Sequence, residues 1–212
     1  MSDSMTTRYR SVIVAVAPVA LLAALLSHPY IAGRMPNDVA IAAAVTAGTT
    51  RWALVHIAAS VASGVVMLAF IAIAGYLREA GEERWSAFGL PFIVIGSTLY
   101  AVLPGMEFAP LAAVEAGADP LAAQSALREW FVPVLVAGGV MFALGVLALS
   151  RAIVISAILS SALTWLVVAA LIVMAGSRFV PFAAAQFYVQ GIASLIALWP
   201  LARQMWNRTS EA

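Results

Sequence analysis

The chain alternates between long apolar runs and short polar segments, and six of the runs are long enough to cross a membrane. A spanning helix needs about 20 mostly apolar residues. The six runs cover residues 11–30, 52–77, 86–103, 131–149, 152–175 and 181–202. They predict an all-α polytopic integral membrane protein in which six transmembrane helices form one bundle and residues 1–212 form a single domain.

The first run resembles a secretory signal peptide, because Arg8 and Arg10 precede an apolar stretch. The run is long for a signal peptide, and residues 27–33 (SHPYIAG) make a poor cleavage site. We therefore expect this helix to be retained as the first of the six spans.

The connections between the runs are short at one face of the bundle and long at the other. The short ones are residues 78–85 and a tight corner at Ser150–Arg151. In the first long connection, residues 31–51, Asn37 or Asp38 can cap a short helix that Gly48 ends. The long connections therefore predict short helices over one end of the bundle.

The second long connection, residues 104–130, follows a break in the third run. Proline lacks the amide hydrogen that a continuing helix needs, so Pro104 and Gly105 predict the end of the third span. Asp119 and Pro120 together form a helix-start signal. We expect a helix that begins there to continue into the fourth span.

Composition supports the membrane assignment and excludes several kinds of function. The chain is 64% hydrophobic and 10% charged, whereas soluble domains average roughly 45–50% and about 25%. It contains no lysine and no cysteine, which excludes Schiff-base cofactors, disulfides, thiolate metal sites and covalently attached haem. A net charge of +1 leaves no electrostatic basis for binding nucleic acid.

The distribution of arginines predicts the orientation of the chain. With six spans, both termini lie on one side, and that side carries seven of the eleven arginines: Arg8, Arg10, Arg78, Arg84, Arg151, Arg203 and Arg208. The other side carries four: Arg34, Arg51, Arg128 and Arg178. Basic residues favour the cytoplasmic side, so we expect a multi-pass protein of the cell membrane with both termini in the cytoplasm.

The candidate functional residues lie at one depth near the outer surface. His28 lies about 24 Å above the inner start of the first span, and His56 about 6 Å below the outer start of the second, at 1.5 Å per residue. The hydrocarbon core is about 30 Å thick, so the two imidazoles are expected at similar depths. Gln186 is expected at the same level, and Glu107 just above it, after the break at Pro104.

His56 is expected to face the inside of the bundle. A stripe of small and polar residues continues along its helix face, formed by Ser60, Ser63, Gly64 and Met67, and small residues mark helix–helix contacts in membranes. Gln186 and Gln190 share one face of the sixth span, and Ser156, Ser160 and Thr164 are expected to form a hydroxyl stripe on the fifth.

These residues predict an outward-facing polar pocket. His56, Glu107, Gln186 and Gln190 are expected to line it, with His28 and Arg178 at its rim. Ionisable residues at membrane depth suggest a functional site. The alternative is that these residues have only structural roles: Glu107 would then face water in a loop, and the histidines and glutamines would form hydrogen bonds between helices.

Four functions remain open. The first is small-molecule or proton-coupled transport, in which a histidine titrating near neutral pH carries the proton. The second is a b-type haem cytochrome with His28 and His56 as axial ligands. The third is a metal-dependent membrane enzyme that uses His28, His56 and Glu107. The fourth is a carrier or accessory subunit without chemistry of its own.

The expected partners follow from the membrane assignment. They are the lipid bilayer, a small-molecule ligand in the pocket, and a second copy of the chain or another subunit of a membrane complex. A haem does not fit between two helices that pack directly on each other, because packed helices lie only about 8–10 Å apart. The haem reading therefore requires the first two spans to lie diagonally across the bundle.

The orientation can be tested with reporter fusions. A reporter fused after Ala212 should be active on the cytoplasmic side, and one inserted at Ala116 should be active on the outer side. Activity of both fusions on the same side would overturn the topology.

Overall fold

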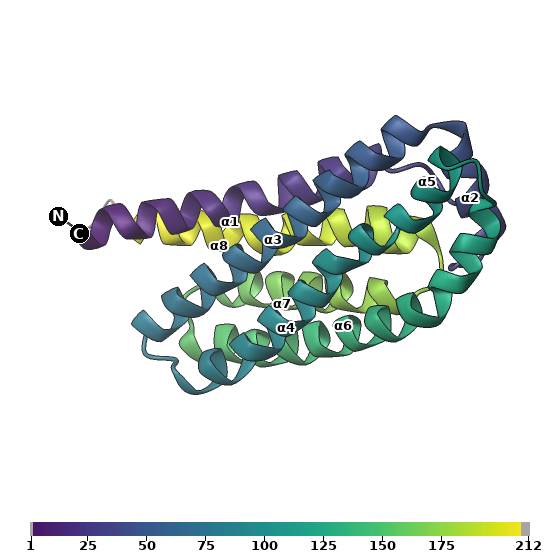
Figure 1. Cartoon of the computed structure of the whole chain (residues 1–212). Coiled ribbons are helices and arrows are strands. Elements are labelled where there is room, and N and C mark those ends of the chain that lie inside the picture. Colours follow the sequence, from purple (N-terminus) through teal and green to yellow (C-terminus); the bar gives the residue numbers. More distant parts are fainter. Residues whose placement is uncertain (1, 209–212) are drawn as a thin grey trace.

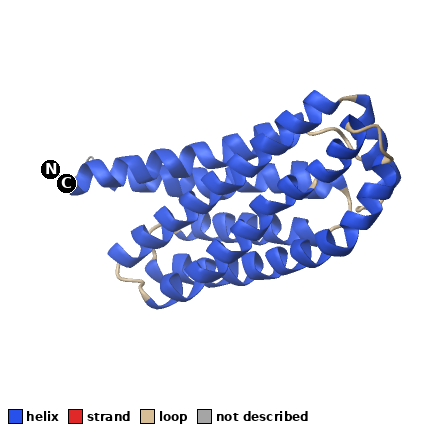
Figure 2. Ribbon diagram, in the orientation of Figure 1, coloured by secondary structure: helices blue, strands red, loops and turns tan. Residues whose placement is uncertain are grey.

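The computed structural model describes residues 2–208, and helices account for nearly all of them (Figure 2). Six helical segments are long and apolar enough to cross a membrane. They contain α1 (Ser2–Ser27), α3 (Thr49–Glu79), α4 (Arg84–Met106), α6 (Pro120–Ser156), α7 (Ser161–Gly176) and α8 (Gln190–Arg208). The predicted all-α bundle with six possible spans is confirmed.

Shorter elements gather at one end of the bundle. Figure 1 shows α2 (Asp38–Ala47) and α5 (Phe108–Glu115) at the end opposite the two termini. A 3-10 turn, η1 (Ser177–Phe179), and a π-helical segment, η2 (Ala184–Val189), connect α7 to α8. We call the end with α2 and α5 the capped end, and the end with the termini the terminal end.

The six long helices form a closed ring in chain order. Each packs against the next, α1 on α3, α3 on α4, α4 on α6, α6 on α7 and α7 on α8, and α8 closes the ring on α1. Helices α2 and α5 pack on each other and on α6. The first and second spans are therefore direct neighbours, and the capped end is covered.

Glycines bring α4 and α6 into very close contact. A Cβ atom built on Gly96 would lie 2.4 Å from the backbone nitrogen of Phe142, and one on Gly145 would lie 2.7 Å from that of Ile93. Gly89 and Gly138 face the same contact one heptad away from Gly96 and Gly145. Small residues at these positions let two backbones approach, as is common between membrane helices.

The predicted helix caps are confirmed. The side-chain oxygen of Asn37 accepts a hydrogen bond from the backbone N–H of Ala40 at 3.2 Å, and α2 ends before Gly48. At the start of α6, the Asp119 carboxylate accepts one from the N–H of Leu121 at 2.9 Å. As expected, α6 then continues without a break through the fourth span.

The break after the third span lies two residues later than predicted. Helix α4 passes through Pro104 and Gly105 and ends at Met106, and Glu107 alone separates it from α5. Pro110 is the third residue of the new helix α5. In the first turn of a new helix, where amide groups have no intrahelical partner, Pro110 is tolerated. Pro110 is thus compatible with a new helix that begins at Phe108.

The corner predicted at Ser150–Arg151 is wrong. Helix α6 continues through both residues to Ser156, and Ala157, in the left-handed region with φ 48°, ends it. Hydropathy falls at Arg151 because arginine is charged, and its side chain is exposed, but nothing in its backbone stops a helix. The expected hydroxyl stripe is therefore also wrong, since Ser156 ends α6 and Thr164 belongs to α7.

Two further span limits differ from the prediction. Helix α1 ends at Ser27 rather than residue 30, because the residue before a proline avoids helical geometry and His28 precedes Pro29. The sixth span begins with the π-helical segment η2, and α8 extends beyond residue 202 to Arg208. His28 therefore lies just outside its helix.

The close contact of α4 and α6 predicts that adding one methyl group at a contact glycine lowers the stability of the protein. Gly96→Ala should destabilise the protein by about 1–3 kcal/mol, because the added carbon meets backbone atoms that must move apart. Gly64→Ala on α3 is the matched control, since nothing lies within 4 Å of a Cβ there. Unfolding in detergent should show a loss for the first variant alone; equal stability of both would contradict the packing.

Candidate functional site

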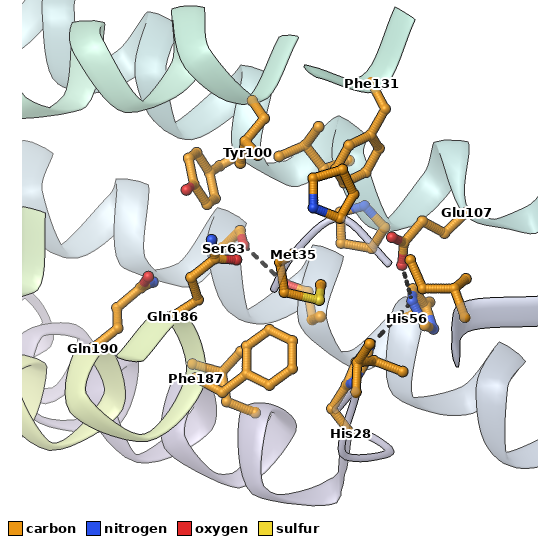
Figure 3. Close-up of a pocket in the computed structure, with 18 of the residues that line it drawn as sticks. His28, Met35, His56, Ser63, Tyr100, Glu107, Phe131, Gln186, Phe187 and Gln190 are labelled. Atoms are coloured by element: carbon orange, nitrogen blue, oxygen red, sulfur yellow. Dashed lines mark hydrogen bonds and ion pairs between the residues drawn. The ribbon is translucent and has the colours of Figure 1, made fainter. Parts of the chain in front are cut away.

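Two histidines and a glutamate meet inside the capped end. His28 follows α1, His56 lies in α3, and Glu107 forms the turn between α4 and α5. The His56 Nε2 atom lies 2.5 Å from Glu107 Oε2 and 3.3 Å from His28 Nε2 (Figure 3). One ligand atom from each residue lies within 4.8 Å of the others. We call these three residues the triad.

Backbone carbonyls fix how both imidazoles are protonated. The Nδ1 atom of His56 lies 2.6 Å from the carbonyl oxygen of Trp52, and that of His28 lies 2.7 Å from the carbonyl oxygen of Pro29. A carbonyl oxygen only accepts, so each Nδ1 carries the hydrogen and donates it. In the neutral imidazoles, the two Nε2 atoms then present lone pairs toward each other, and the Nε2 of His56 also faces the Glu107 carboxylate.

The triad is largely buried, and burial favours the neutral form of His28. His56 is 1% exposed and Glu107 9% exposed. Burial, and after it the nearby His56, lowers the pKa of His28. Three electron-pair donors that point at one another in a buried place repel unless a proton or a cation lies between them.

Trp52 organises the triad, although it was not among the predicted site residues. Its ring stacks on His56 with centroids 4.2 Å apart, and its indole Nε1 donates to the backbone oxygen of Glu107 at 3.0 Å. Its carbonyl accepts from the ring of His56. The available sequence signal was the spacing: Trp52 lies four residues before His56 and therefore on the same helix face.

A small apolar core covers the triad. Ile41 and Val45 of α2, Leu111 of α5 and Ile31 of the preceding loop pack around Trp52. All five side chains are buried. The predicted short helices thus exclude water from the three polar residues.

A cavity of about 130 Å³ adjoins the triad. Figure 3 shows Gln186, Gln190 and Tyr100 on the side of the cavity away from His28 and His56. The Gln186 amide donates to the carbonyl oxygen of Val180 at 3.1 Å. The other lining residues are mainly apolar and include Leu21, Leu25, Ile31, Met35, Leu103, Phe131, Leu135 and Phe187. The cavity has room for a small organic molecule beside the triad.

Arg178 lies elsewhere than predicted. Instead of standing at the rim, its side chain is 6% exposed and its guanidinium lies over the rings of Tyr100 and Phe142, at 3.8 and 3.6 Å from their centroids. It lines a second, smaller cavity together with Val66 and Ser97. Val66 is ten residues along α3 from His56, about 15 Å deeper. The structure therefore brings five of the six predicted residues to one cavity and places Arg178 beneath it.

The histidines do not fit a haem. An axial pair needs the porphyrin ring between its two Nε2 atoms, but Glu107 Oε2 lies 2.5 Å from the Nε2 of His56 and occupies that space. Helices α1 and α3 also pack directly on each other, which is the arrangement that leaves no space for a macrocycle. The three donor atoms lie within 4.8 Å of one another, and two histidines with one carboxylate are a ligand set that can hold a metal ion.

Comparison of the chain with protein-family models, curated proteins and solved structures finds no match in any of the three. The function of this site is therefore argued from its geometry and chemistry.

The hydrogen bond from Trp52 to the Glu107 backbone predicts a specific loss of stability. Trp52→Phe keeps an aromatic ring beside His56 but removes the donor, and it should destabilise the protein by about 0.5–1.5 kcal/mol. Trp130→Phe is the control, because Trp130 is 73% exposed. Unfolding in detergent measures both, and a loss of the same size in the control would contradict this role of the indole.

Proposed function

We propose that the chain is a metal-dependent membrane enzyme that holds one divalent transition-metal ion with His28, His56 and Glu107. The observation that carries the proposal is the protonation pattern: both Nδ1 groups donate to carbonyls, so the Nε2 lone pair of His56 faces the Glu107 carboxylate and that of His28 faces the Nε2 of His56. Metal-binding histidines commonly donate their second ring nitrogen in this way. A cation between the three donors removes their mutual repulsion.

The ligand set supports catalysis rather than a structural role. Catalytic zinc sites use three protein ligands and keep one position open, and two histidines with one carboxylate also suit non-haem iron. The cavity of about 130 Å³, which we call the large cavity, lies beside the triad, so a small molecule in it could reach the open position. A bound ion would supply Lewis-acid activation of water or of the substrate there.

The chain's own residues prepare this reaction site. Trp52 orients His56 and the Glu107 backbone, and the apolar cover keeps bulk water away from the ligands. Gln186 and Gln190 offer amide groups to the polar part of a substrate. On the arginine distribution we place both termini in the cytoplasm, which puts the capped end at the outer face of the cell membrane.

Proton-coupled transport is the second candidate, and the short contact between His56 and Glu107 favours it. Such a pair can share and release a proton. Large core side chains fill the bundle toward the terminal end, among them Phe70, Ile73, Val146, Leu149 and Ile153. An inward path for a substrate would require the helices there to separate.

Metal binding to the purified protein tests the proposal. Chelator-treated protein in detergent is titrated with Zn²⁺ and Co²⁺, and the visible bands of Co²⁺ report nitrogen and oxygen ligation. We expect one ion per chain. Glu107→Gln and His56→Gln should each weaken binding by more than about 100-fold, beyond the 10–100-fold typical of outer-shell changes.

Glu115→Gln is the matched control, because this exposed acid ends α5 outside the triad. It should bind metal as the unaltered protein does. Thermal unfolding of every variant separates loss of a ligand from loss of the fold. Stoichiometric binding that survives in folded Glu107→Gln and His56→Gln, or no binding by the unaltered protein, would refute the metal centre.

A further inference from the structure

Arg178 has a buried guanidinium whose hydrogen-bonding capacity is unused. Its Nε and Nη1 atoms are buried and have no hydrogen-bond partner, and the side chain is 6% exposed. Among the described residues, no carboxylate lies within salt-bridge distance of it. A buried charge of this kind is unfavourable unless it is paired and hydrogen-bonded.

The aromatic neighbours of Arg178 satisfy only part of this requirement. Tyr100 and Phe142 present their ring faces to the guanidinium carbon, and ring faces attract a cation. The N–H groups point along the plane of the guanidinium, however, and rings above or below that plane cannot accept those hydrogen bonds. The in-plane donors still need an acceptor.

A small cavity beside Arg178 has room for such an acceptor. Its volume is about 10 Å³, close to the space that one water-sized sphere occupies. Ser97 lines the same cavity, and its buried hydroxyl also has no partner. The cation and the free hydroxyl beside this space are the hydrogen-bond donors that a small anion, either a halide ion or a single carboxylate group, would need.

Neither buried acid among the described residues pairs with Arg178. Glu107 is bonded to His56 in the triad, and Glu82 accepts a hydrogen bond from the backbone of Trp85 at the terminal end. An anion bound at Arg178 would therefore come from outside the described part of the chain. The small cavity shares Leu21, Ser63 and Tyr100 with the large one, so the two are adjacent.

We propose that Arg178 and Ser97 form a monoanion-binding site inside the membrane bundle, beneath the large cavity. Its ligand is either a free halide or the carboxylate end of a small molecule that occupies the large cavity. This site does not rest on the metal centre, since its residues are separate from the triad.

Anion-dependent unfolding tests the site. The protein is prepared in detergent with the bulky sulfonate of a HEPES buffer as the only anion, and chloride, acetate and hexanoate are then added separately at constant ionic strength. At ten times its dissociation constant, a bound anion should raise the unfolding temperature by about 3–6 °C. Arg178→Gln should abolish this shift. Arg34→Gln, which alters an exposed arginine, should retain it.

The anion-free state provides a second readout. If the site needs an anion, Arg178→Gln without chloride or carboxylate should be at least as stable as the unaltered protein, because it removes an unpaired buried charge. If Arg178 is held by its aromatic neighbours and a water alone, Arg178→Gln should be less stable in every buffer and no anion should matter. That result would overturn the proposal.

The choice of anion separates the two sources. A response to chloride but not to hexanoate assigns a free halide. A stronger response to hexanoate, lost in Leu135→Trp, assigns a carboxylate that reaches down from the large cavity, because Leu135 lines that cavity and not the small one. Equal shifts in the unaltered protein and Arg178→Gln for all anions would remove the site.

Discussion

Polar groups at the depth of the hydrocarbon must be enclosed by protein, and this constraint explains how the molecule is built. Irregular backbone at that depth survives only inside protein or along a wet cavity. In this bundle, irregular backbone close to the candidate spans occurs at the capped end, after α1, at Glu107, and between α7 and α8. The N–H of Met35 donates to the carbonyl oxygen of Pro181 at 2.9 Å, which ties two of these segments together. Helices α2 and α5 cover the same end, whereas the turns at the terminal end are short.

The geometry of the triad depends on contacts made far below it. His28 and His56 approach because α1 and α3 are packed side by side along the bundle. Glu107 reaches His56 because α4 packs on α3 while the glycines of α4 and α6 hold these two helices close. The three residues of the triad come from separate elements, so their relative positions depend on how firmly those elements pack together. The substitution of one glycine in the bundle therefore bears on the ligand geometry as well as on stability.

The sequence predicts how far along the bundle the site lies, but it does not show which helices are neighbours there. Counting residues from the ends of the apolar runs placed His28 and His56 at one depth, and the structure has their rings in contact. Hydropathy reports how apolar a stretch is and not where its helix ends. The polar pair at Ser150–Arg151 therefore looked like a corner, although α6 continues past it. Arg178 was misplaced for another reason: its side chain points back into the bundle, toward Tyr100 and Phe142 on helices whose adjacency no single-helix pattern reveals.

The two proposed sites together favour a resident ion over an ion in transit. A divalent ion bound by two neutral imidazoles and one carboxylate leaves a net positive charge at the triad. While its own anion site is empty, Arg178 adds a second positive charge beside the adjoining smaller cavity. Charges in a low-dielectric interior interact strongly, and a buried arginine repels cations that approach it, as in pores that exclude protons. A metal ion or proton leaving the triad inward would meet this barrier, whereas an anionic substrate would be attracted to the cavity between the two charges.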